Sequence, residues 1–196
     1  MAGARDVYFI THPDVRIDPQ TPVPEWSLSE RGLSRMRAAL AQPWVAQLTS
    51  VYSSAEVKAR EGAGFLAERL GWSLRIVPDL GEVNRSATGY LPHAEHEATA
   101  NEMFANPELS ARGWETARGA QARVVEAVHD IVLADKTSGA IAIVSHGAVG
   151  ALLLCHLKRV AIDRRYDQPG SGGGNYFVFN YPPGTVRHDW RPIENS

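Results

Sequence analysis

Cysteine is almost absent from this chain, since Cys155 is the only one among 196 residues. A single thiol excludes an internal disulfide and a zinc site built from several cysteines. Long apolar runs are lacking too, so no segment is predicted to cross a bilayer. Residues 1–6 do not show the basic stretch and long apolar stretch of a secretory signal. We therefore expect a cytoplasmic protein with no membrane partner.

An excess of positive charge is also lacking. Lysine and arginine number 20 against 22 aspartates and glutamates, which gives a formal net charge of −2. Proteins that bind nucleic acid usually carry a basic surplus, so we expect no nucleic-acid partner. What the chain does have is 44% hydrophobic residues, and we expect residues 1–196 to form one domain with a sizeable core. The sequence does not indicate the oligomeric state.

Strand-like and helix-like patterns alternate along the chain. Apolar runs predict strands at 7–10, 51–54, 74–77 and 141–144, and a hairpin over 175–190 that turns at 182–184. Helices are predicted after a capping box at 27–30, from the second strand to about residue 70, and over 94–104, 113–134 and 148–157. This alternation favours an α/β fold, a three-layer α/β/α sandwich with a mostly parallel sheet. The polar segment 82–112 is expected to run over the sheet edge and to select a substrate.

Two of the predicted strands end on a histidine, His12 and His146. Ligands bind at the carboxyl ends of parallel strands, so neighbouring strands would place both imidazoles in one crevice. A neutral imidazole can attack phosphorus and form a phosphohistidine that water later opens. The second imidazole could donate a hydrogen bond to the transferring group. The plainer alternatives are a surface histidine beside Pro13 and a histidine that merely caps the next helix.

An acid and an anion-binding backbone are predicted close to these histidines. Glu82 lies in a loop where another strand should finish, and a neighbouring phosphate would raise the pKa of its carboxyl group. It could then protonate a leaving alkoxide, although a solvated loop glutamate is the plainer interpretation. Gly147 opens the helix after His146, where a ligand could approach the backbone N–H groups closely.

Four basic residues are candidates for holding a phosphate. Lys58 and Arg60 belong to the first turns of the second predicted helix, and Arg16 and Arg85 belong to the loops of His12 and Glu82. We expect at least one of the arginines to point into the crevice, with Arg85 as the first choice. Each of the four could also be an ordinary surface charge.

From residue 7 to about residue 157, the chain resembles the histidine phosphatase superfamily, the phosphoglycerate-mutase-like enzymes. The segments 27–32, 51–59, 80–82 and 144–147 are similar to the family's motifs. The resemblance implies that His12 is the nucleophile, His146 the second active-site histidine and Glu82 the proton donor. It also implies that no metal or other cofactor is needed and that the partner is a small phosphorylated substrate.

The chain departs from the family pattern at two positions that bind phosphate. Thr11-His12-Pro13 stands in place of Arg-His-Gly, and Lys58 stands in place of a second arginine. Losing one preorganised donor typically costs ~10²–10³ in rate. We therefore predict slow hydrolysis of a phosphate monoester through His12, which Thr11→Arg should accelerate if space permits. The alternatives are a catalytically silent relative that binds a phosphorylated ligand or partner, and a phosphomutase.

Two weaker patterns do not change this interpretation. His93 and His96 stand three residues apart on a predicted helix, but a metal site would need further ligands, so none is predicted. The glycine-rich stretch 170–174 is not followed by Lys-Ser or Lys-Thr, so it does not match a phosphate-binding P-loop. We expect it to form a flexible loop.

Overall fold

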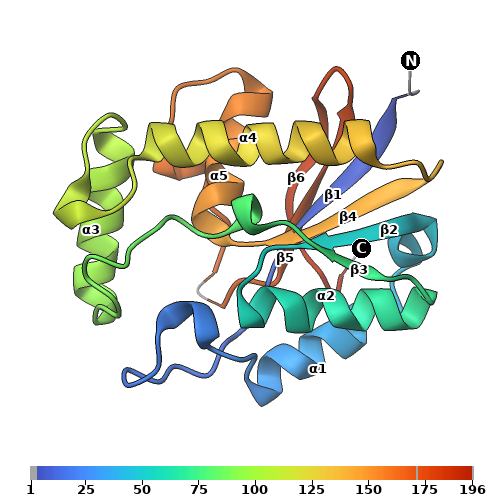
Figure 1. The fold of residues 1–196 in the computed structure, drawn as a ribbon, viewed down its shortest axis with the longest axis horizontal. Helices are drawn as coiled ribbons and strands as arrows, with labels where there is room; N and C mark the ends of the chain where they lie inside the picture. Colours follow the sequence, from blue (N-terminus) through green and yellow to red (C-terminus); the bar gives the residue numbers. More distant parts are fainter. Residues whose placement is uncertain (1–3, 171, 196) are drawn as a thin grey trace.

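The computed structural model describes residues 4–170 and 172–195, and it contains a six-stranded mixed sheet (Figure 1). Residues 1–3, 171 and 196, which the sequence assigns to the domain and to the glycine-rich loop, lie outside the described residues. The strand order is β3-β2-β4-β1-β5-β6. The parallel strands are β1 (Arg5–Thr11), β2 (Leu48–Ser53), β3 (Leu74–Ile76) and β4 (Ala140–Ser145). The predicted hairpin is confirmed as β5 (Asn175–Tyr181) and β6 (Thr185–Pro192), and it pairs antiparallel with β1.

Helices cover both faces of the sheet, which confirms the predicted three-layer α/β fold. α1 (Glu30–Ala39) and α2 (Val57–Leu70) lie on one face, and α4 (Ala117–Ala134) and α5 (Gly147–Lys158) lie on the other (Figure 1). α3 (His93–Ala105) stands at one end of the molecule. In the part of the chain that the structure describes, no helix combines the length and the apolar composition needed to traverse a bilayer.

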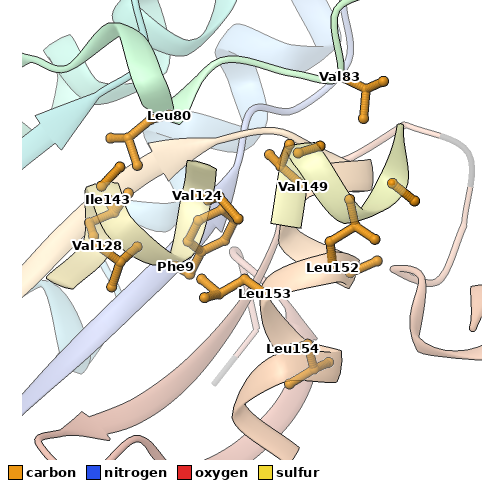
Figure 2. Close-up of a cluster of buried hydrophobic side chains, with 14 of the residues drawn as sticks. Phe9, Leu80, Val83, Val124, Val128, Ile143, Val149, Leu152, Leu153 and Leu154 are labelled. Atoms are coloured by element: carbon orange, nitrogen blue, oxygen red, sulfur yellow. The ribbon is translucent and has the colours of Figure 1, made fainter. Parts of the chain in front are cut away.

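The alternation of side chains along the central strands builds two cores. Phe9 and Ile143 point to the α4–α5 face, where they pack with Val124, Val128 and Leu152 (Figure 2). Ile10 and Val144, on the same strands, point to the opposite, α1–α2 face, where they are buried together with Met36, Ala63 and Leu66. Burial of each large apolar side chain contributes about 1.5–3 kcal/mol, so both faces stabilise the sheet.

Two predicted helix starts are wrong. The capping residue of α1 is Ser29 instead of Ser27, because the Ser29 hydroxyl accepts the Gly32 N–H at 3.2 Å and an antiparallel bridge holds Leu28 extended. α4 begins at Ala117 instead of Gly113, with Thr116 as its cap. The reason is a left-handed backbone at residues 112 and 113, which no α-helix can include.

The strand pairing brings together the residues that follow β1, β2 and β4. β1 and β4 are neighbours in parallel register, with Thr11 opposite Ser145. The His12 N–H donates to the Ser145 carbonyl at 3.0 Å, and the Ser54 N–H donates to the Val144 carbonyl at 3.1 Å. His12, Ser54 and His146 therefore start from adjacent positions at one edge of the sheet.

Candidate active site

A cavity of about 660 Å³ opens at this edge of the sheet. His12 and Pro13 line it from the end of β1, and Gly147 lines it from the start of α5. The segment predicted to select a substrate supplies another wall, with Val83, Arg85, His93, His96, Glu97, Ala100, Met103 and Phe104 among its lining residues. The cavity thus combines polar groups at the strand ends with a partly apolar wall from α3.

His12 is held in one tautomer by its own loop. Its Nδ1 lies 2.9 Å from the Pro13 carbonyl oxygen, which can only accept, so the ring proton is on Nδ1 and the lone pair is on Nε2. Burial and the nearby Lys58 lower the pKa of His12 to about 4. The imidazole is therefore neutral at physiological pH, which is the state that a nucleophilic histidine requires.

His146 packs edge-on against His12, with ring centroids 5.1 Å apart and an interplanar angle of 68°. Its Nε2 lies 2.7 Å from the Ser54 hydroxyl and 3.3 Å from Glu56 Oε1. The ring is completely buried and does not itself line the cavity, whereas its Nδ1 has no hydrogen-bond partner among the described residues. Burial lowers the pKa of His146 well below its usual value, although Glu56 acts in the opposite direction.

The Glu82 carboxylate lies at the N-terminus of α5. It accepts the N–H groups of Ala148 and Val149 at 3.1 and 3.2 Å, and that of Val83 at 2.9 Å. Two of the N–H groups predicted to face a phosphate, those of Ala148 and Val149, thus already donate to Glu82, whereas Gly147 lines the cavity. The pKa of Glu82 is raised, as expected, but the main cause is burial and no ligand is required.

Arg123, which sequence analysis missed, holds the Glu82 loop in place. Its guanidinium donates to the carbonyls of Asp79 and Gly81 at 2.7 and 3.0 Å and to that of Glu82 at 3.3 Å, and it pairs with Glu115 at 2.8 Å. In the sequence, Arg123 cannot be told apart from an ordinary solvent-exposed arginine on a helix, so nothing in the sequence indicated this role.

Glu56, also missed by sequence analysis, engages Lys58. The Lys58 ammonium group contacts the Glu56 carboxylate and donates to the Val23 carbonyl at 2.8 Å. Lys58 is 3% exposed and does not line the cavity, and burial lowers its pKa. Although burial opposes it, the neighbouring His146 ring and the Lys58 ammonium group lower the pKa of Glu56 to about 2. The Lys58 charge is therefore already paired.

Among the three candidate arginines, only Arg85 lines the cavity. Its guanidinium carbon lies 6.0 Å from the centroid of the Trp114 ring, and no ion pair joins it to any residue within 4–170 or 172–195. Arg16 and Arg60 are exposed and lie outside the cavity lining, so the structure does not support their candidacy. Their side chains start from positions that face solvent.

Thr11 occupies the place where the family motif has arginine. It is fully buried, its hydroxyl donates to Gln168 Oε1 at 2.6 Å, and it accepts the Asn175 N–H at 3.0 Å. These partners fill the surroundings of Thr11, so the space that a Thr11→Arg substitution would need is already taken.

The far wall of the cavity carries a second polar group of residues. Arg164 pairs with Glu97 at 2.8 Å, and the His96 ring lies 5.4 Å from the ring of Trp114. His93 and His96 both line the cavity, but within the described residues no three His, Cys, Asp or Glu side chains are grouped so as to hold a metal ion.

Comparison with known proteins places this architecture in a family. The model of the histidine phosphatase superfamily (branch 1) matches residues 13–181. The chain belongs to this superfamily. No curated protein sequence matches it.

Several solved structures share the fold at low sequence identity. Mycobacterial glucosyl-3-phosphoglycerate phosphatase with inorganic phosphate matches at a TM-score of 0.76 and 21% identity, over 98% of this chain and 100% of that one. YhfR of Bacillus stearothermophilus matches at a TM-score of 0.77 and 21% identity, over 94% of this chain and 95% of that one. Phosphoglycerate mutase of Bacillus anthracis matches at a TM-score of 0.75 and 14% identity, over 98% of this chain and 95% of that one. A phosphatase and a mutase thus occur among the solved structures that share this fold.

Proposed function

We propose that this protein hydrolyses a phosphate monoester through a phosphohistidine intermediate on His12. The observation that carries the proposal is the hydrogen bond between His12 Nδ1 and the Pro13 carbonyl, because it leaves a neutral Nε2 lone pair in the cavity. Nε2 attacks phosphorus while the bond from phosphorus to the leaving oxygen breaks. Nδ1 keeps its proton and stabilises the charged ring by donating to the carbonyl.

Glu82 is the proposed proton donor to the leaving oxygen. Burial raises its pKa, which favours a protonated carboxyl group at the start of the reaction. In the second half, water attacks phosphorus, the P–N bond breaks, and the Glu82 carboxylate receives the proton of water. Inorganic phosphate leaves, and His12 and Glu82 return to their starting states. Arg85 is the proposed anion ligand.

A trapping experiment tests this proposal. The protein is incubated with a panel of small phosphomonoesters, quenched in alkali and analysed for phosphohistidine, with phosphate release measured in parallel. We expect phosphohistidine and slow turnover, below ~1 s⁻¹, from the wild type. His12→Ala should abolish both, whereas His188→Ala, at a strand on the protein surface, should abolish neither. Turnover without a His12 adduct would contradict the mechanism. Transfer to a second hydroxyl without release of phosphate would identify a mutase.

A second candidate is a protein that binds a phosphorylated ligand without turnover. The observation that favours it is the pairing of Lys58 with Glu56 together with the absence of an arginine at Thr11. Calorimetric binding of phosphate with no phosphohistidine and no hydrolysis would support this candidate against the phosphatase.

A further inference from the structure

The candidate site is short of positive charge for a phosphoryl dianion. Thr11 is neutral, and Lys58 is already paired with Glu56. Two arginines line the cavity, and Arg164 is paired with Glu97, so Arg85 is the lining arginine that has no ion pair among the described residues. Removing a dianion from water without compensating charge is unfavourable, so a bound dianion requires another source of positive charge.

Glu56 is oriented toward the group that can supply this charge. One oxygen of its carboxylate, Oε1, lies 3.3 Å from His146 Nε2 and accepts the Glu82 N–H at 2.9 Å. The other oxygen, Oε2, contacts Lys58. Nε2 thus faces two oxygen atoms, the Ser54 hydroxyl at 2.7 Å and the Glu56 carboxylate. Because the carboxylate can only accept while the hydroxyl can do either, we assign the ring proton to Nε2, which leaves the lone pair of His146 on Nδ1.

The unpartnered Nδ1 of His146 is the informative atom. It is buried and has no hydrogen-bond partner in the described part of the chain, and an unsatisfied buried polar atom is unfavourable. In the neutral ring this atom presents a lone pair, which repels an oxyanion bound at His12. In the charged ring it presents an N–H, which can donate to such an oxyanion. The two states of His146 therefore have opposite effects on anion binding.

We propose that Glu56 is a positioning residue that lets His146 take up a proton when an anion binds at His12, so that an imidazolium supplies the positive charge that an arginine at position 11 would otherwise supply. The proposal rests on the anion site of the proposed function. Glu56 acts through His146: it receives the Nε2–H bond of the charged ring, while the new Nδ1–H faces the bound anion.

The groups around His146 explain why proton uptake accompanies binding and does not precede it. His12 approaches from the end of β1, Glu56 and Lys58 from the start of α2, and Arg85 from the loop after Glu82. Without a ligand, burial and the three basic neighbours outweigh Glu56 and keep the pKa of His146 well below its usual value. An anion within ~4–6 Å favours the charged ring, and it reverses this balance.

Calorimetric titration with sulfate measures the proposed proton directly. Sulfate stays dianionic near neutral pH, so any proton taken up on binding goes to the protein. Titrations at pH 7 in two buffers with different ionisation enthalpies give the number of protons bound. We expect about one proton per sulfate for the wild type and about none for Glu56→Gln. The control is Glu61→Gln on the same helix, whose carboxylate accepts the Leu28 N–H at 2.7 Å and contacts neither histidine. It should keep the wild-type value.

Two further measurements keep the proposal falsifiable if Glu56→Gln does not fold. The double variant Glu56→Gln/Lys58→Met removes both charges of this ion pair together, and it should also bind sulfate without a proton. Nitrogen-15 NMR of the histidine rings, assigned with His146→Asn, should show His146 becoming doubly protonated in the wild type when sulfate is added. Glu82→Gln should retain the proton uptake, because the proton does not go to Glu82.

Each outcome bears on one proposal in particular. Sulfate binding without proton uptake, unchanged uptake in Glu56→Gln, loss of uptake in Glu82→Gln, or no sulfate binding would each overturn the role given to Glu56. A His12 phosphohistidine would still support the phosphatase in those cases. Proton uptake that depends on Glu56, without any phosphohistidine, would instead support the role of Glu56 beside His146 and contradict the phosphatase.

Discussion

The half-buried, neutral His12 should make the protein acid-sensitive in a defined pH range. Its pKa falls from 6.5 to about 4 in the folded protein, while the unfolded chain keeps the ordinary value. Between these two values the unfolded state binds more protons than the folded state, so stability declines as the pH falls from about 6.5 to about 4. Replacing His12 by Asn removes this titration, and the asparagine amide can still donate to the Pro13 carbonyl.

The size of the effect follows from the difference between the two pKa values. Each pKa unit corresponds to about 1.4 kcal/mol, so the whole range from 6.5 to 4 is worth about 3 kcal/mol. Most of this, ~2–3 kcal/mol, is lost by pH 4.5, because only a small part of the titration lies below that pH. At pH 7.5 the contribution is fully present. Carboxylates that titrate in the same range do so in both proteins, and they cancel in the difference.

The assay is urea unfolding of the wild type and His12→Asn at pH 7.5 and 4.5 in buffers free of phosphate and sulfate. Between the two pH values, the wild type should lose ~2–3 kcal/mol more than His12→Asn. His188→Asn is the matched control, because His188 Nδ1 lies 2.7 Å from the carbonyl of the following residue at the protein surface. Equal pH dependence in wild type and His12→Asn would refute the assignment of a His12 that stays neutral down to a pKa of about 4.

Three further changes test the site. Arg85→Ala should weaken phosphate or vanadate binding by more than ~1.5 kcal/mol in calorimetry, and Arg16→Ala, outside the cavity, should leave it unchanged; equal affinities would reject Arg85 as the anion ligand. Gly173→Ala should lose more stability and activity than Gly170→Ala, because both glycines have positive φ but only the Gly173 Cβ would strike the backbone carbonyl of the candidate nucleophile. The Gly170 strain alone should cost ~1–2 kcal/mol in urea unfolding, and equal losses would disprove the contact. Thr11→Arg should lower the urea midpoint by the equivalent of ~1–3 kcal/mol, the cost of overpacking a filled site; a stable variant with faster turnover would contradict this.

Local patterns were enough to predict the elements that carry the histidines. Apolar runs ending in His12 and His146 indicated two parallel strands, and their pairing in register is what the fold contains. The helix starts were less predictable. Ser27 and Ser29 both offer a capping hydroxyl, and only the bridge that holds Leu28 extended decides in favour of Ser29.

The partners of charged side chains could not be predicted in the same way. From the sequence, Lys58 is a candidate to bind phosphate through its positive charge. In the fold it pairs instead with Glu56, two residues earlier, and donates to the carbonyl of Val23, which lies 35 residues away. Likewise, the Ala148 N–H at the start of α5 donates to the Glu82 carboxylate, which lies 66 residues away in the chain. A sequence motif shows which charged side chains and N–H groups are present, but it does not show which of them will pair with each other in the fold.

The sequence by itself determined the order of strands and helices and the positions of the two histidines at strand ends, because these depend on periodicity and on residues next to one another in the chain. Only the tertiary structure decided that His146 is buried behind His12, that Arg123 supports the loop of Glu82, and that Glu56 lies beside His146. These contacts join segments from different layers of the fold. Their charge states follow from burial and from neighbours within a few ångströms, and both arise only when the chain is packed.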